Sequence, residues 1–398
     1  MLLEQSDYFG HYQSNRTMNF EFTEEQLMIR QAARDFAERE LLDDVIERDT
    51  HSIYPTEHVK KLAELGFLGM LVDPKYDGGG MDTISYVLAM EEISKVDSSV
   101  SVIMSVNNSL VCYGLENFGT EAQKEKFLKP LARGEKIGAF LLSEPEAGSD
   151  ATSQRTTAED KGDYYLLNGT KNWITSGNTA GTYLVIAQTH PEKGHKGINV
   201  LIVDRNSPGI SVGPHEDKMG MRSSDTHSVM FNDVKVPKEN RIGADGFGFK
   251  FAMKTLEGGR IGIAAQATGI AAGAFERSVR YAKERKAFGT QLVNHQSVAF
   301  KLAEMAVKIE NARNLCLKAA WLKDQNKPYG YASAMAKYYA AEAAMWVTTE
   351  AVQIHGGYGY VKEYHVERLM REAKLTQIYE GTSEIQKIVI SRQVINDF

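Results

Sequence analysis

The sequence predicts a mainly helical protein in which a small antiparallel β domain lies between two helical domains. Three observations support this fold class. Apolar residues recur at helical spacing from Thr23 onward, the period changes from 3.6 to 2 between about Gly138 and Gly243, and helical periodicity returns after Gly248. We therefore expect an N-terminal helical domain at residues 18–137, a middle β domain at 138–244 and a C-terminal helical domain at 245–398.

Composition excludes several classes of protein. The 398 residues have a formal net charge of −6, acidic and basic residues are interspersed, and no Lys/Arg run exists, so we expect no nucleic-acid partner. No apolar run approaches the ~18 residues of a membrane-spanning helix, so we expect no membrane insertion. Cys112 and Cys316 lie far apart among apolar residues, which indicates reduced thiols and a cytoplasmic protein.

The N-terminal domain is expected to begin at Met18, because residues 1–17 are polar and lack periodicity. Thr23 and Gln26 have the spacing of a capping box at the first helix. A second helix is expected from Pro55 to Leu65 and ends at Gly66. A third is expected from Thr83 to about Lys95.

The run from Val100 to Val111 is apolar but contains serines and asparagines. Two interpretations stay open. The run lines a partly polar cavity, or it is a buried helix whose hydroxyls bond to its own backbone.

The middle domain contains short runs of β-branched and aromatic residues between Asn-Gly, Gly, Pro and Asn-Asp turn signals. The expected strands include Tyr164–Leu167, Tyr183–Ile186, Ile198–Val203 and Ser228–Phe231.

The C-terminal domain shows an unbroken 4-3 spacing of apolar residues, which predicts the seam of a left-handed helix bundle. The seam residues are Val298, Leu302, Met305, Ile309, Ala312, Cys316 and Ala319. Its expected partner helices are Phe251–Glu284, about Tyr331–Ile354, and a last helix from Ser383.

Glu380 follows an apolar and aromatic segment and precedes Gly381. Shortly after it, Ser383 and Gln386 have the spacing of a helix capping box. A carboxylate in this position can be shielded by Tyr379 and approached over the glycine, as a general base requires. The alternative is a solvated carboxylate near a helix N-terminus.

The sequence lacks Gly-x-Gly-x-x-Gly after a strand, a Walker-type Gly-Lys-Thr/Ser and His-Glu-x-x-His, so it predicts no Rossmann, P-loop or metal site. Three polar segments remain, at 143–150, 172–176 and 353–357. The first can bind a phosphate or a heteroaromatic edge through backbone N–H groups. The second presents Trp173 beside Thr175, which suits a planar cofactor, although Trp173 can also be a core aromatic.

In their order, six motifs closely resemble the acyl-CoA dehydrogenase family of flavoenzymes over essentially the whole chain after Met18. They are Ser-Glu-Pro-Glu-Ala-Gly-Ser-Asp at 143–150, Asn-Trp-Ile-Thr at 172–175, Lys-Met-Gly-Met-Arg-Ser-Ser at 218–224, Glu-Arg-Lys-Ala-Phe-Gly at 284–289, Gln-Ile-His-Gly-Gly at 353–357, and Ile-Tyr-Glu-Gly-Thr-Ser-Glu-Ile-Gln at 378–386.

The resemblance implies a middle β-barrel domain, a C-terminal four-helix bundle and a homotetramer. It also implies FAD as cofactor and α,β-dehydrogenation of an acyl-CoA to a trans-2-enoyl-CoA in fatty acid β-oxidation. Electrons would pass to an electron transfer flavoprotein. By resemblance Glu380 is the base that removes the α-proton.

The other site residues follow from the same resemblance. Leu142, Ser143, Trp173, Ile174 and Thr175 match flavin-contacting positions. Ser149 matches a position between substrate and cofactor. The positions that hold the FAD pyrophosphate and adenine, partly across a subunit interface, are matched by Arg285, Gln296, Gln353, Ile354, His355, Gly356 and Gly357. Further FAD contacts are matched by Thr382, Ser383 and Glu384, and acyl-CoA contacts by Glu257, Gly258, Gly259, Arg260 and Gly381.

Two positions bear on specificity. Glu146 stands where many relatives have Gly and adds a charge beside the flavin loop. Gly259 stands where branched-chain and long-chain members can place their base, so the chain resembles the short-chain, butyryl-type members. Two alternatives stay open, an acyl-CoA oxidase that uses oxygen and a catalytically silent acyl-CoA-binding homologue.

Overall fold

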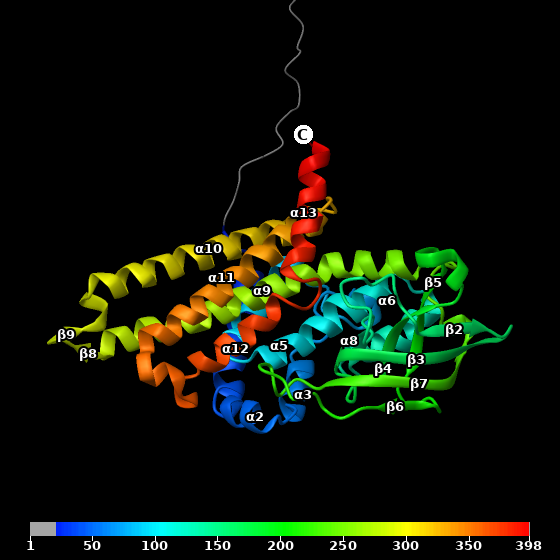
Figure 1. The fold of residues 1–398 in the computed structure, drawn as a ribbon, viewed down its shortest axis with the longest axis horizontal. Helices are drawn as coiled ribbons and strands as arrows, with labels where there is room; N and C mark the ends of the chain where they lie inside the picture. Colours follow the sequence, from blue (N-terminus) through cyan, green and yellow to red (C-terminus); the bar gives the residue numbers. More distant parts are fainter. Residues whose placement is uncertain (1–20, 398) are drawn as a thin grey trace, which may run out of the picture.

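The computed structural model describes residues 21–397, and the expected start at Met18 lies outside them. Three long helices of the C-terminal domain run along the molecule, the strands of the middle domain gather at one end, and the short strands β8 (Lys286–Ala287) and β9 (Thr290–Gln291) lie at the other (Figure 1). The N-terminal helices pack beside the long helices and the middle domain. None of the helices in the described part of the chain combines the length and apolarity that crossing a bilayer requires.

The N-terminal helices follow the predicted order. The Thr23–Gln26 capping box is present at α1: Gln26 N donates to Thr23 Oγ1 over 3.2 Å, and Thr23 N donates to Gln26 Oε1 over 3.0 Å. Gly66 follows the cap of α3 with φ +74°. The helices are α1 (Glu24–Phe36), η1 (Ala37–Leu41), α2 (Val45–His51), α3 (Thr56–Glu64), η2 (Pro74–Tyr76), α4 (Thr83–Ser94), α5 (Ser98–Ser105), η3 (Val106–Cys112), α6 (Tyr113–Phe118), α7 (Glu121–Gln123), η4 (Lys124–Leu128) and α8 (Lys129–Ala132).

The polar run at 98–112 is buried along its whole length as α5 and η3. The hydroxyls of Ser101 and Ser109 donate to carbonyls of their own helix, over 3.1 and 2.7 Å. Asn107 and Asn108 instead donate to two carbonyls of the loop between α3 and η2, those of Leu68 and Phe67, both over 2.8 Å. The hydroxyls of Ser101 and Ser109 fit the second interpretation, whereas Asn108 also lines a pocket with Lys323 and Tyr329, as the first interpretation expects.

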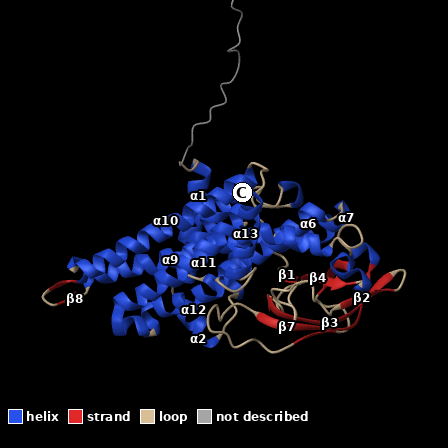
Figure 2. Cartoon of the chain, turned by 45° about the horizontal axis from the view of Figure 1, so that its top comes forward, coloured by secondary structure: helices blue, strands red, loops and turns tan. Residues whose placement is uncertain are grey.

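The middle domain is a seven-stranded sheet at the edge of the helical body (Figure 2). The predicted β domain is confirmed, and most strand pairs are antiparallel, but β1 and β2 each pair in parallel with β4. A parallel pair needs a long crossover, residues 142–181 between β1 and β4, which local alternation does not reveal. The strands and short helices are β1 (Gly138–Leu141), β2 (Thr157–Asp160), β3 (Tyr164–Thr175), β4 (Thr182–Gln188), η5 (Pro191–Gly197), β5 (Ile198–Asp204), β6 (Ile210–Val212), β7 (Thr226–Pro237) and η6 (Lys238–Asn240).

The C-terminal domain is built on α9 (Gly248–Glu284), α10 (Gln296–Asp324) and α11 (Gly330–His355), which lie side by side in Figure 1. Six of the seven predicted seam residues of α10 are buried, and Val298 is half-buried. Between these helices and at the end of the chain lie β8 (Lys286–Ala287), β9 (Thr290–Gln291), η7 (Leu292–Asn294), η8 (Gly356–Tyr360), η9 (Lys362–Tyr364), α12 (Val366–Thr376) and α13 (Ser383–Asp397).

The last helix differs from the prediction. We expected the helix from Ser383 as a bundle partner, but α12 packs against both α9 and α11, whereas α13 contacts α11 and points away from the long helices (Figure 1). Within the described residues of α13 only Ser383 and Gln386 are buried. The apolar face of α13 is therefore largely exposed in the single chain.

Candidate active site

Glu380 lies in the turn between α12 and α13 and has φ +50°, followed by Gly381 with φ +90°. A left-handed backbone is costly for a residue with a Cβ, so other contacts must hold this turn. Ser383 N donates to Gln377 O over 2.9 Å, and Gln386 Nε2 donates to Gly381 O over 2.8 Å. The turn is thus closed from its own two flanking helices.

The predicted Ser383–Gln386 capping box is wrong. Thr382 provides the cap, because its Oγ1 accepts from Ile385 N over 3.3 Å. Ser383 is the first residue of α13, and its hydroxyl donates to Glu342 over 2.6 Å. The Gln386 amide instead donates to Gly381 O of the strained turn, so it does not cap the N-terminus of α13.

Both carboxylate oxygens of Glu380 are buried and have no hydrogen-bond partner in the part of the chain that the structure describes. They lie against Gly259 of α9: a methyl group on Gly259 would come within 2.2 Å of Glu380 Oε2 and 2.8 Å of Leu110 Cδ2. Only glycine leaves room for the carboxylate at this position. The solvated-carboxylate alternative for Glu380 does not fit this burial.

Burial raises the pKa of Glu380 to about 7, although the positive charges of Lys337 and Arg260 oppose the shift. Burial also lowers the pKa of the Lys337 ammonium to about 8. A carboxylate with a pKa near neutrality is a stronger base than an exposed one, and it is still ionised in a substantial fraction of molecules at pH 7. The site therefore suits proton abstraction from a weak carbon acid.

A polar network holds the residue before the base. The Tyr379 hydroxyl donates to Gln266 Oε1, and Gln266 Nε2 donates to Ser101 Oγ over 2.8 Å and to Ser98 O over 3.0 Å. Lys337 and Gln266 were missed by reasoning from sequence. A lysine inside the alanine-rich stretch of α11 was a signal for Lys337, because a lysine is rarely buried without a partner.

The segment Glu257–Arg260 that sequence assigned to substrate lies on α9 beside this turn. A methyl group on Gly258 would lie 3.8 Å from the Tyr329 hydroxyl and 3.9 Å from Lys323 Nζ. Arg260 is buried, and its Nε lacks a hydrogen-bond partner within residues 21–397. Gly259, Arg260, Glu380 and Gly381 thus meet, whereas Ser149 lies in an exposed loop of the middle domain.

Trp173 stands at a bulge of β3, with φ +61° and 61% of its surface exposed. Because the indole is exposed, Trp173 is not the core aromatic of the alternative interpretation. Its neighbour Ile174 is buried in the core instead. Asn172 N donates to Ser143 O over 2.9 Å, which brings the two predicted flavin segments together. Asn172 Oδ1 and Ser176 Oγ are buried without a partner within the described residues. A strained, exposed indole beside unpaired polar atoms fits the edge of a planar heteroaromatic ligand.

The two carboxylates of the 143–150 loop have different environments. Glu144 is buried and accepts from Lys171 Nζ over 2.8 Å and from the backbone N–H groups of Arg155 and Thr156. Glu146 is exposed and pairs with Arg155 over 2.5 Å. The charge that distinguishes position 146 is therefore compensated by a neighbour within the same domain.

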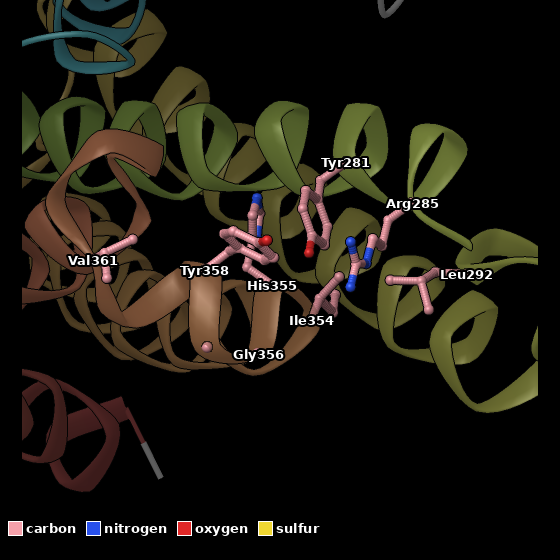
Figure 3. Close-up of a pocket in the computed structure, with 9 residues that line it drawn as sticks. Tyr281, Arg285, Leu292, Ile354, His355, Gly356, Tyr358 and Val361 are labelled. Atoms are coloured by element: carbon pink, nitrogen blue, oxygen red, sulfur yellow. The ribbon is translucent and has the colours of Figure 1, made fainter. Parts of the chain in front are cut away.

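A pocket of about 490 Å³ lies where the ends of α9 and α11 meet (Figure 3). His355 stacks on Tyr281 with ring centroids 4.3 Å apart, and the Arg285 guanidinium lies 5.4 Å from the centroid of the Tyr358 ring. A methyl group on Gly356 or Gly357 would meet no atom within 4 Å, so a ligand can reach this backbone. The lining residues are Tyr281, Arg285, Leu292, Ile354, His355, Gly356, Gly357, Tyr358 and Val361.

Burial lowers the pKa of His355 below its usual value, which favours the neutral ring. The Nδ1 atom lies 2.7 Å from Ala351 O, which accepts a hydrogen bond from it. The other nitrogen, Nε2, is then an acceptor. The pocket thus combines a cation, stacked aromatics and an open glycine backbone, as recognition of a nucleotide requires.

This pocket and the Glu380 turn are far apart in one chain. About 25 helical residues separate Arg260 from Arg285, which at 1.5 Å per residue is roughly 37 Å. Gln296 and Gln353 are outside the pocket lining, although each is within a few residues of it in sequence. Thr382, Ser383 and Glu384 instead lie next to the Glu380 turn. No metal-binding group of His, Cys, Asp or Glu occurs among residues 21–397.

Comparison with known proteins gives a consistent result. Three family models match, described as the N-terminal, middle and C-terminal domains of acyl-CoA dehydrogenase, over residues 23–135, 139–234 and 246–395. A short-chain specific acyl-CoA dehydrogenase of Clostridium acetobutylicum is 50% identical over 95% of this chain and 100% of its own length.

Two solved structures extend the comparison. Butyryl-CoA dehydrogenase from Megasphaera elsdenii superposes with a TM-score of 0.94 at 49% identity, over 95% of this chain and all of the other. A chain from a structure described as an electron transferring flavoprotein of Acidaminococcus fermentans superposes with a TM-score of 0.94 at 50% identity, over 95% of this chain and 99% of the other.

Proposed function

The chain belongs to the acyl-CoA dehydrogenase family, and from this premise we propose that Glu380 is the base that removes the α-proton of a short-chain acyl-CoA. The protein is an oxidoreductase that dehydrogenates the acyl chain between its α and β carbons. It uses FAD and passes the electrons to an electron transfer flavoprotein. The observation that carries the assignment of the base is the buried, unpaired carboxylate of Glu380.

The turn that holds Glu380 can also stabilise the charge that proton removal creates. As the α-proton leaves, negative charge develops on the thioester oxygen and needs preorganised donors. The backbone N–H of Glu380 has no acceptor within the described residues, so it is free to donate to that oxygen. Gly381 adds no side chain beside it, which leaves the thioester access to the turn.

We assign FAD to two sets of residues. Leu142, Ser143, Ser149, Trp173, Ile174, Thr175 and Thr382–Glu384 would hold the flavin end near Glu380. Arg285, Gln296 and residues 353–357 would hold the pyrophosphate and adenine of a second FAD, which belongs to another copy of the chain. When bound, the flavin accepts the β-hydrogen as a hydride.

Arg285 lies roughly 37 Å along α9 from Arg260, which is beside the Glu380 turn, and this separation favours a homo-oligomer in which the two sets hold different FAD molecules. We propose a homotetramer. We also propose a cytoplasmic location, because the free thiols of Cys112 and Cys316 are buried and suit a reducing compartment.

The proposed function is tested by adding acyl-CoAs of different chain length to the FAD-loaded protein without oxygen. We expect butyryl-CoA to bleach the flavin faster than palmitoyl-CoA, because Gly259 matches the short-chain members and the chain is 50% identical to a short-chain specific acyl-CoA dehydrogenase. Faster bleaching by palmitoyl-CoA would contradict the short-chain assignment. Reoxidation is then compared with oxygen and with an electron transfer flavoprotein, and faster reoxidation by oxygen would favour an oxidase.

A further inference from the structure

Lys337 is a buried cation that the function described above does not use. It lies on α11 with its side chain fully buried, and its Nζ donates to Gly381 O over 2.7 Å. Burial of an ammonium is costly unless a partner compensates, so its position beside the strained turn calls for an explanation.

We propose that Lys337 is a positioning residue of the reaction: it fixes the Glu380–Gly381 turn through the Gly381 carbonyl and places a positive charge behind the carboxylate of Glu380. The inference deepens the proposed function and rests on Glu380 being the base.

Lys337 contacts the strained turn directly. Glu380 and Gly381 are consecutive left-handed residues, and the first of them carries a side chain. The Gly381 carbonyl accepts from Lys337 Nζ of α11 and from Gln386 Nε2 of α13, so two separate elements hold the same peptide group. Gln386 Nε2 also donates to Glu380 O over 3.4 Å, so both carbonyls of the turn that carries the Glu380 side chain are held.

Lys337 also acts on Glu380 through its charge. The groups whose charges act on Glu380 are Lys337 and Arg260, both cations. Those that act on Lys337 are Glu380 first, then Arg260, which repels it, and Glu342 and Glu384, which attract it. The hydroxyls of Tyr379 and Tyr86 also feel the charge of Glu380, but burial raises the pKa of both far above neutrality. Lys337 therefore supplies the main charge that keeps Glu380 ionised.

The direction of the effect follows from the sign of this charge. Burial favours the protonated form of Glu380, and the ammonium of Lys337 favours the ionised form. Removal of the ammonium would raise the pKa of Glu380 above about 7. The ionised fraction of Glu380 would then be smaller at neutral pH, and raising the pH would increase it again.

The test is the pH dependence of anaerobic flavin reduction by butyryl-CoA in the FAD-loaded protein. We expect Lys337→Met to shift the rate profile to higher pH by about one unit, which is about tenfold slower reduction on the acid side. Lys337→Arg keeps a charge and a donor and should return the profile toward the wild type. Gln386→Met is the matched control, because it removes a hydrogen bond to the same carbonyl without removing a charge.

We expect Gln386→Met to lower the maximum rate and leave the pH profile in place. A wild-type profile for Lys337→Met would overturn the inference, as would an equal shift in Gln386→Met. If Lys337→Met does not fold, Lys337→Gln keeps a donor and loses the charge, so the same shift is expected. Infrared difference titration of the carboxyl band, with Glu380→Gln as blank, gives a second readout that does not depend on turnover.

The two proposals fail in different ways. If Glu380→Gln reduces flavin at the wild-type rate, the assignment of the base is wrong. If Glu380→Gln is inactive and the profile of Lys337→Met is unchanged, only the role of Lys337 is wrong.

Discussion

The Glu380 turn and the Arg285 pocket are built in opposite ways. The carboxylate of Glu380 is enclosed, whereas Arg285 and Tyr358 are exposed beside an open pocket of about 490 Å³. The turn is held by hydrogen bonds from α11 and α13 of the same chain. The proposed proton-transfer groups therefore all lie within one chain, whereas the pocket that we propose for the FAD nucleotide is open at its surface.

We therefore expect that chemistry and cofactor retention can be separated by substitution. A change at the Glu380 turn should alter the rate and leave FAD bound. A change at the pocket should release FAD and leave the chemistry of the loaded protein intact.

The largest effect is expected for Glu380→Gln. The amide is nearly isosteric but cannot accept the α-proton, and general-base catalysis is worth roughly 10²–10⁴-fold. Anaerobic flavin reduction by butyryl-CoA should fall by at least the lower figure, while FAD content and acyl-CoA binding remain. Reduction at the wild-type rate would show that Glu380 is not the base. Loss of FAD would show that the Glu380 turn and FAD retention are not independent.

Arg285→Ala is the complementary change. A hydrogen bond to a charged group contributes about 1.5–3 kcal/mol, so FAD affinity should fall roughly 10–100-fold. Because the pocket is expected to bind a cofactor shared between subunits, gel filtration should also show smaller oligomers. Saturation with FAD should restore most of the flavin reduction rate.

The matched control for Arg285→Ala is Arg280→Ala, which removes an exposed arginine of the same helix outside the pocket lining. It should leave FAD content and oligomeric state unchanged. A fully flavinated tetramer in Arg285→Ala would show that the pocket is misassigned.

The smallest effect is expected for a relocated base. In Glu380→Gly the carboxylate is lost, and the space next to Gly259 is freed, because Glu380 Oε2 is the nearest atom to a methyl group there. Adding Gly259→Glu should recover about tenfold in flavin reduction over Glu380→Gly alone. Leu110 Cδ2, at 2.8 Å from the same methyl position, limits the recovery. If the double variant shows no recovery, Gly259 does not face the substrate α-carbon, although the role of Glu380 stands.

The sequence alone determined those features that depend on neighbours along the chain. The capping box of Thr23 and Gln26, the stop at Gly66 and the seam of α10 were predicted because caps and helical periodicity are local. The resemblance to the family predicted Glu380 as the base and the segments that would hold the cofactor, and both stay predictions. Local spacing also misled: Ser383 and Gln386 have capping-box spacing, but Gln386 bonds to the strained turn instead.

Tertiary structure decided which distant residues meet. The parallel pairing of β1 with β4, the departure of α13 from the bundle and the contact of Gly259 with Glu380 depend on packing between separate elements. Lys337 is 44 residues from Gly381 in the sequence, and only the packing of α11 against the turn brings its ammonium to that carbonyl. The burial that raises the pKa of Glu380 has the same origin, because desolvation is produced by the whole surrounding fold and not by neighbours along the chain.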